Sequence, residues 1–225
     1  MGVGRLHAAS LTPEVAAQSQ QWCRENQVAC LYFLGPETGE VPAGFRLVDE
    51  RITLAWDAHP IAAPSPAVRP LEAADLPVLE NIARQSHRDT RFYADPLFDR
   101  ARCDELYATW IRRSCQGWAD AVLVATCEGL PAGYVTCKNG AIGSGQNVAV
   151  GSGQNGAIGL IAVASPARGR GLGRQLVTAA QAYFASHGAT CVTVVTQGRN
   201  RGARRLYEGC GFHFAGAQHW YHFHA

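Results

Sequence analysis

The residues best suited to chemistry lie in a turn rich in glycine and arginine, residues 165–173 (SPARGRGLG). The turn follows an apolar run at 158–163, which predicts a buried strand. It precedes residues 175–187, where apolar residues recur at helical spacing. A turn between a strand and a helix N-terminus presents unpaired backbone N–H groups at the positive end of the helix dipole. The pattern therefore predicts an anion receptor suited to a diphosphate.

Glycine and arginine have different uses in this turn. Gly169, Gly171 and Gly173 permit backbone angles that side chains forbid, and they let the main chain approach a ligand closely. From Ser165 to Tyr207 the chain has seven arginines and no acidic residue, although its net charge is only +2. The arginines are Arg168, Arg170, Arg174, Arg199, Arg201, Arg204 and Arg205. This local basic field suits a compact anion, whereas a nucleic-acid groove would need a wider basic surface with stacking aromatics.

Other phosphate-binding motifs do not fit this segment. A P-loop needs Gly-Lys-Ser/Thr, which is absent from the turn. A dinucleotide-binding fingerprint needs an acidic residue after the next strand, where residues 196–199 read TQGR instead.

Two motifs, taken in order, resemble the signatures of the Gcn5-related N-acetyltransferase (GNAT) family. Residues 163–173 follow V-x-x-P-x-R-G-R-G-L-G and resemble the family's acetyl-CoA pyrophosphate loop. Residues 200–212 follow N-x-x-A-x-x-L-Y-x-x-x-G-F and resemble its second signature. The resemblance implies an α/β fold of the α+β type, with a mixed central sheet flanked by helices, and acetyl-CoA as co-substrate.

The resemblance also implies roles for individual residues. The loop that would hold the CoA diphosphate comprises Arg168, Gly169, Arg170, Gly171, Leu172, Gly173 and Arg174. The main chain of Ile161 and Val163 would pair with the pantetheine arm, and an N–H near Val163 would stabilise the acetyl oxygen. Asn200 would hydrogen-bond the CoA arm, and Tyr207 would protonate the departing thiolate. A lone tyrosine is more often a core aromatic, but the Leu-Tyr-x-x-x-Gly-Phe frame favours catalysis.

A further segment resembles one subgroup, the TDP-fucosamine acetyltransferases. Residues 86–96 (SHRDTRFYADP) and 106–111 (LYATWI) carry this likeness. The subgroup acetylates the 4-amino group of a dTDP-linked deoxysugar in bacterial surface-polysaccharide (lipopolysaccharide) synthesis. It implies a nucleotide-sugar acceptor. Two alternatives stay open: another amine, such as a protein N-terminus, lysine, polyamine or aminoglycoside, and a non-catalytic acyl-CoA-binding module.

Three neighbouring residues are candidates for acceptor binding. Arg91 could neutralise a nucleotide diphosphate, and Phe92 or Tyr93 could stack on thymine or sugar. The competing interpretation is that Arg91 pairs with Asp89 or Asp95 and that Phe92 belongs to the core.

Two residues are candidates for the general base. Asp49 lies where the resembling enzymes place an acidic residue close to the acceptor, so its carboxylate could receive the amine proton. A solvated acid at a strand edge is the alternative. His87, in the acceptor segment, is the second candidate because its pKa is ordinarily near neutral.

Neither a metal site nor a membrane segment is expected. The eight cysteines form no Cys-x-x-Cys pair, which is typical of reduced cytosolic thiols. His222 and His224 would share one face of a last strand at 217–224, but no third ligand stands at a recognisable spacing, so a structural role is favoured. No apolar run could span a membrane. The resembling enzymes are cytoplasmic and often dimeric, which leaves room for a homodimer.

A proline-rich stretch at 60–70 predicts a linker between two units. Residues 1–59 are expected to form a small α/β unit, with a helix at 13–27 and strands at 29–34 and 46–56, interpreted as a degenerate copy of the C-terminal half. Residues 71–225 are expected to form the acetyltransferase domain, with helices at 72–84 and 97–116 and paired strands at 121–126 and 133–138.

A repeat of Gly-Ser-Gly-Gln-Asn, at 143–147 and 151–155, lies between the strands expected at 133–138 and 158–163. Its composition predicts a mobile loop or an extended hairpin. An incidental duplication is favoured over a substrate lid.

Overall fold

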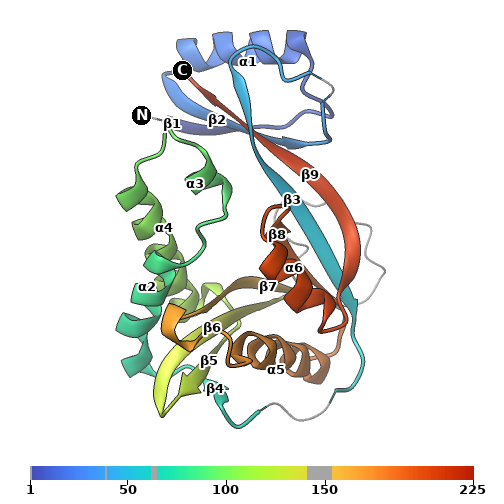
Figure 1. The fold of residues 1–225 in the computed structure, drawn as a ribbon. Coiled ribbons are helices and arrows are strands. Elements are labelled where there is room, and N and C mark those ends of the chain that lie inside the picture. Colours follow the sequence, from blue (N-terminus) through green and yellow to red (C-terminus); the bar gives the residue numbers. More distant parts are fainter. Residues whose placement is uncertain (1, 39, 62–64, 141–153) are drawn as a thin grey trace.

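The structure, a computed structural model, describes residues 2–38, 40–61, 65–140 and 154–225. Its centre is one nine-stranded sheet in the order β1-β2-β9-β3-β8-β7-β6-β5-β4 (Figure 1). β1 pairs with β2 and β7 with β8 in parallel, and the other neighbours are antiparallel. A mixed sheet flanked by helices confirms the predicted fold class.

The helices and strands are β1 (Gly2–Leu6), α1 (Pro13–Glu25), β2 (Val28–Gly35), β3 (Phe45–Asp57), β4 (Val68–Pro70), α2 (Leu76–Gln85), α3 (Arg91–Ala94), α4 (Arg100–Arg113), β5 (Ala121–Cys127), β6 (Leu130–Asn139), β7 (Gln154–Val163), α5 (Leu172–Ser186), β8 (Ala189–Gln197), α6 (Arg201–Glu208) and β9 (His213–His224). Every helix and strand expected within the described residues is present, most of them with shifted ends. The short β1, β4 and α3 were not expected. None of the helices in the described ranges combines the length and the apolar content that a membrane crossing requires.

Side chains alternate between the two faces along each strand, so both faces of this sheet carry apolar residues that helices cover. Val135 and Cys137 of β6 pack with Leu176 of α5 in one core. Tyr134, the residue before Val135, points to the opposite face and packs with Leu79 of α2 in a second core that also includes α4. The acetyltransferase half is therefore a layered arrangement of helices around a central sheet (Figure 1).

The N-terminal and C-terminal parts of the chain share this sheet. β3 lies between β8 and β9, pairing with β8 over 51–57 and with β9 over 45–55. β9 extends onward to pair with β2, where α1 covers a third core around Phe33 and Tyr221 (Figure 1). The boundary predicted at 60–70 therefore does not separate two sheets, since residues before it supply a central strand.

Most of the glycine-rich repeat lies outside the described residues, and its last two residues, Gln154 and Asn155, begin β7. Residues 141–153 lie outside the described ranges, and they include the first copy of Gly-Ser-Gly-Gln-Asn and most of the second. The expectation of a loop or hairpin there stays a prediction.

Candidate active site

β7 separates from β8 halfway along its length. Its pairing with β8 ends at Ile158, whereas its pairing with β6 continues to Val163. At that point two residues of β7, Gly159 and Leu160, face the single residue Thr136 of β6, which is a β-bulge. A bulge bends its strand and increases its twist. Gly159 is required there because a Cβ would lie 2.8 Å from the Thr136 hydroxyl oxygen.

Among the described residues, no strand pairs with the β8-facing edge of the separated half of β7, although the Val163 carbonyl there accepts from Arg168 Nε. The Leu160 N–H donates to Thr136 Oγ1 and the Ala164 N–H to a carbonyl of β6, each at 2.8 Å. Successive residues of a strand direct their backbone groups to opposite sides, so Ile161 and Val163 face the gap between β7 and β8. An extended ligand arm can pair with such an edge as an added strand. The two residues predicted to contact pantetheine are thus aimed into the gap.

The glycine-arginine turn follows β7 and begins α5. Gly169 and Gly171 have φ of +78° and +79°, where a side chain would be strained. A Cβ at Gly169 would meet no atom within 4 Å, so the outer surface of the turn is open. Gly171 is the N-cap of α5 and has no side chain to accept from the first-turn N–H groups. These are the features of an anion receptor at a helix N-terminus.

The arginines of the turn are held by the surrounding protein. Arg168 Nε donates to the last carbonyl of β7 at 3.1 Å. Arg170 pairs with Glu128 at 3.0 Å, and Arg174 donates to the Gly209 carbonyl at 2.6 Å. These contacts fix the turn against β7, the β5–β6 connection and the end of α6. The backbone N–H groups are therefore the main candidates for phosphate contact.

The second signature motif docks on the first. Asn200 caps α6 at the end of β8, and its Oδ1 accepts from the Ala203 N–H at 3.0 Å. Leu206 lies against Gly173, where an added Cβ would come within 3.2 Å of Leu206 Cδ2. The Asn200 amide nitrogen has no hydrogen-bond partner within the described ranges, so it can donate to a ligand beside the gap.

Tyr207 is buried in the core, and its ring lies 5.7 Å from that of Phe212. Burial raises the pKa of Tyr207 above its ordinary value, so the phenol keeps its proton at neutral pH. Its hydroxyl has no hydrogen-bond partner among the residues that the structure describes. The ring thus packs as a core aromatic, and the hydroxyl stays available as a proton donor.

Asp49 lies at the open end of the gap. Its strand, β3, begins to pair with β8 at Arg51, opposite the last residue of β8, so Asp49 stands just beyond the end of β8. β7 and β8 are parallel, and their C-terminal ends are the ones that separate. The carboxylate is 4 % exposed, which excludes the alternative of a solvated edge acid.

The environment of Asp49 suits a base. Burial raises the pKa of Asp49 to about 7, against the opposing charges of Arg199 and Arg91. Its Oδ1 makes no hydrogen bond, although Arg199 lies 3.5 Å away as an ion pair. An open pocket of about 480 Å³ lies here, and its lining consists of Glu37, Leu47, Val48, Asp49, Glu50, Arg199 and His219.

Arg91 is held by aromatic rings and by one histidine. Its guanidinium carbon lies 4.1–4.2 Å from the ring centroids of Tyr32, Phe92 and Trp220. Its Nη1 donates to His222 Nε2 at 2.8 Å. Within the described ranges it forms no ion pair with a carboxylate, so the alternative pairing with a nearby aspartate is not observed. Arg91 and Asp49 are close enough for each to affect the pKa of the other, in addition to the larger effect of burial on both.

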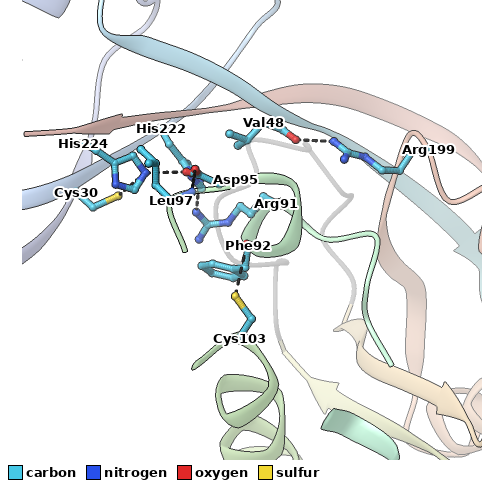
Figure 2. Close-up of polar contacts among 10 residues, drawn as sticks. All are labelled: Cys30, Val48, Arg91, Phe92, Asp95, Leu97, Cys103, Arg199, His222 and His224. Carbon is cyan, nitrogen blue, oxygen red and sulfur yellow. Dashed lines mark hydrogen bonds and ion pairs between the residues drawn. The ribbon is translucent and has the colours of Figure 1, made fainter. Parts of the chain in front are cut away.

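A buried network lies behind Arg91. Asp95 Oδ2 accepts from His222 Nδ1 and from His224 Nε2, each at 2.7 Å, and Cys30 Sγ lies 3.8 Å from His224 Nε2 (Figure 2). Burial acts to raise the pKa of Asp95, but the hydrogen bonds from both histidines outweigh it and keep the pKa low.

Asp95, His222 and His224 are also residue types that bind metals, and their ligand atoms lie within 4.8 Å of one another. Asp95 is thus a possible third metal ligand, which its distance in the sequence from the two histidines had hidden. However, an arginine can only donate, so His222 Nε2 must accept and its proton must be on Nδ1, the nitrogen that faces Asp95. A metal there would need Nδ1 unprotonated. The contacts therefore favour the structural role expected for these histidines.

His87 is a poor base in this environment. Its Nε2 lies 3.0 Å from the Tyr134 hydroxyl, and its ring stacks on Tyr107 at 4.7 Å. Burial lowers the pKa of His87 to about 4. The histidine is therefore neutral at pH 7 and binds a proton weakly.

The two aromatic candidates differ in position. Tyr93 is buried, with its hydroxyl donating to Asp104 of α4 at 2.5 Å, so the structure does not bring it to Arg91 and Asp49. Phe92 is partly buried beside the core of α2 and α4, and it also stacks on Arg91. Phe92 is therefore both a core contact and a neighbour of the proposed acceptor-binding arginine.

The residues that hold Arg91 and Asp49 were not predicted for that role: Trp220 was not named, and His222 and Arg199 were named only as a possible metal ligand and as part of the basic field. Trp220 and His222 hold Arg91, and Arg199 contacts the strand beside Asp49. One signal was available: Gly159 interrupts an apolar strand, and an isolated glycine in a strand often marks a bulge. The contacts to Arg91 and Asp49 depend on the order of the strands, which no local pattern indicates.

The comparisons with known proteins agree with this geometry. The profile of the Acetyltransferase (GNAT) family matches residues 79–212, which span α2 to the end of α6. A dTDP-fucosamine acetyltransferase of Escherichia coli O6:H1 is 26 % identical over 220 residues, which are 95 % of this chain and 86 % of that protein.

Two solved structures share the fold. A GNAT-family acetyltransferase from Novosphingobium aromaticivorans has a TM-score of 0.59 at 17 % identity, covering 88 % of this chain and 75 % of that one. A conserved protein of unknown function from Staphylococcus epidermidis has a TM-score of 0.64 at 14 % identity, covering 96 % and 82 %.

Proposed function

Since the chain belongs to the acetyltransferase (GNAT) family and is an N-acetyltransferase, we propose that it acetylates the 4-amino group of a dTDP-linked amino-deoxysugar, with acetyl-CoA as donor. One observation carries the choice of acceptor: the buried carboxylate of Asp49 lies near the guanidinium of Arg91, which has no carboxylate partner among the described residues. An amine on an anionic carrier needs both. The dTDP-fucosamine acetyltransferase that resembles this chain over most of its length supports the same acceptor.

In the proposed reaction, direct transfer forms the new nitrogen–carbon bond and breaks the carbon–sulfur bond in one complex. Asp49 receives the proton that the attacking amine loses. With a pKa of about 7, its carboxylate is substantially ionised at neutral pH and still basic enough to accept it. The buried Tyr207 phenol supplies a proton to the leaving thiolate. A main-chain N–H near Val163 stabilises the acetyl oxygen as its negative charge grows.

The donor would lie between β7 and β8. Its pantetheine arm would pair with Ile161 and Val163, and its diphosphate would lie on the N–H groups between Arg168 and Arg174. The amide nitrogen of Asn200 would donate to the arm. A dTDP-sugar acceptor would place the reaction in the cytoplasm, in the synthesis of a surface polysaccharide.

A second acceptor class is favoured by one specific observation. The pocket beside Asp49 also has Glu37 and Glu50 in its lining, so three carboxylates face one arginine and one histidine, His219. Such a pocket attracts cations, which would suit a polyamine or a lysine side chain.

Release of CoA in the presence of acetyl-CoA and a panel of amines tests both. The panel contains a dTDP-4-amino-deoxysugar, a UDP-amino-sugar, a lysine peptide, spermidine and an aminoglycoside. Turnover confined to the dTDP-sugar supports the proposal, and turnover with spermidine or the peptide alone replaces it by the cationic class. Binding of acetyl-CoA without turnover of any acceptor would point to an acyl-CoA-binding module. Asp49→Asn is the matched control, because it keeps the shape of the side chain and removes its ability to accept a proton.

A further inference from the structure

The strand that carries Asp49 is irregular directly before it. Leu47 pairs with Tyr221 of β9 and Asp49 pairs with the preceding residue, Trp220, so Val48 has no partner on β9. On the other side of β3, pairing with β8 begins only at Arg51. The backbone around Val48 therefore lacks a regular ladder on both sides, although Val48 is 4 % exposed. A buried backbone carbonyl without a partner would be costly.

The connection between β8 and α6 supplies the missing partners. Arg199 Nη2 donates to the Val48 carbonyl oxygen (Figure 2). The same nitrogen lies 3.5 Å from Asp49 Oδ1. One residue earlier, the Gly198 N–H donates to the Glu50 carbonyl at 2.8 Å. Two consecutive residues of this connection thus follow β3 across Asp49 in place of a neighbouring strand.

Glycine at position 198 leaves room for the Glu50 side chain. A Cβ there would overlap the Glu50 side chain, including its Cδ at 2.8 Å. With a side chain at position 198, Glu50 would have to move aside.

We propose that Arg199 is a positioning residue, which holds the bulge at Val48 and thereby aims the Asp49 carboxylate at the acceptor amine. The inference rests on the proposed role of Asp49 as the base. The inference also connects Asp49 to the donor side, because the residue after Arg199 is Asn200, which caps α6 and is proposed to contact acetyl-CoA. One short connection would then set both the donor-side amide and the acceptor-side base.

The charge of Arg199 gives this role a measurable signature. Apart from Arg199, the groups that act on Asp49 or line its pocket are Arg91 on α3, Asp89 before α3, Tyr107 on α4, Glu37 after β2, Glu50 on β3 itself and His219 on β9. Burial raises the pKa of Asp49, and Arg199 is the largest opposing influence. We therefore expect loss of the Arg199 charge to raise this pKa further. Since the base works only when ionised, the acid limb of kcat/KM must move to higher pH.

The test is the pH profile of kcat/KM for the acceptor in the full-length enzyme. We expect a wild-type limb near pH 7, and in Arg199→Ala a limb about one unit higher with about fivefold lower kcat/KM at pH 7. Arg199→Lys should restore the position of the limb but only part of the rate, because ammonium keeps the charge and lacks the planar fork. Arg46→Ala is the matched control: it removes an exposed arginine from the same strand and should leave the limb in place.

Two further measurements separate the possible failures. The Kd for acetyl-CoA should be unchanged in Arg199→Ala, which establishes that the variant is folded. If Asp49→Asn is inactive and Arg199→Ala lowers kcat/KM equally at all pH values, Arg199 is merely structural and the inference is wrong, while Asp49 remains the base. If Asp49→Asn retains full activity, the proposed function of Asp49 fails first.

Discussion

The proposed donor side and the proposed acceptor side of the site, called the donor side and the acceptor side below, are built in different ways. On the donor side, residues 158–174 form a strand end, a turn and a helix start in one continuous stretch, and the second motif docks on it through Leu206 and Gly173. On the acceptor side, Asp49 comes from β3, Arg91 from α3 and His222 from β9. The donor side depends mainly on backbone conformation, and the acceptor side on side chains brought together by strand order.

This difference predicts how each side fails. Donor binding should be lost when the backbone surface of the turn is blocked, and it should tolerate changes elsewhere. Acceptor recognition should weaken in steps, since each side chain contributes separately. The variants below test this contrast, beginning with the largest expected effect.

Gly171→Asp should weaken acetyl-CoA binding by about 1,000-fold, because it places a carboxylate against the expected diphosphate. The fold should survive, since aspartate is a favourable N-cap residue and tolerates positive φ better than most. Calorimetry measures the affinity, and thermal melting checks the fold. Gly171→Asn is the matched control with the same shape and no charge, and it should bind far better than the aspartate variant. Equal affinity of the two variants would contradict a diphosphate at this turn.

Tyr207→Phe should lower kcat by about 100-fold, the usual contribution of a positioned proton donor. The ring stays packed beside Phe212, so the Kd for acetyl-CoA should change little. Steady-state kinetics and calorimetry on the same preparation separate the two effects. An unchanged kcat would leave Tyr207 as a core aromatic only and would remove catalysis from the second motif.

Arg91→Lys should raise KM for a dTDP-amino-sugar by about tenfold, because lysine lacks the planar fork and the stacking of arginine. The Kd for acetyl-CoA should be unaffected, as expected if the two sides act separately. A cationic acceptor such as spermidine provides the comparison, since its KM should not rise. An equal rise for both acceptors would argue for a packing role of Arg91 rather than recognition of an anion.

Asp49→Asn should stabilise the protein at alkaline pH, although it lowers activity. A carboxyl whose folded pKa is raised to about 7 loses stability as pH rises from its unfolded pKa to that value, and the loss is constant above it. The advantage of the variant should therefore be larger at pH 8 than at pH 5, by about 3 kcal/mol. Melting curves at the two pH values measure it. An advantage independent of pH would show that Asp49 has an ordinary pKa, which would weaken its assignment as the base.

The expectations from the sequence followed the same division. The strand, turn and helix of the donor side lie where expected, since apolar periodicity and glycine-rich turns are local signals. On the acceptor side, Asp49 and Arg91 were named, but the surroundings that decide their chemistry were not. His87 is neutral because it is buried, and the Tyr93 hydroxyl is occupied by a hydrogen bond to Asp104 of α4. The proline-rich stretch predicted two separate units, but β3, which precedes it, lies between β8 and β9 of the same sheet. No local pattern in the sequence indicates this strand order.

The sequence by itself determined the family, the elements of the catalytic half and the residues of the donor turn, because each depends on neighbours within a few positions of the chain. Only the tertiary structure decided which partners Asp49 and Arg91 have. Arg199 lies 3.5 Å from a carboxylate 150 positions earlier, and His222 holds an arginine 131 positions before it. Such contacts follow from strand register and from the bulge at Val48, and a pKa near 7 arises only when those contacts exclude water from Asp49.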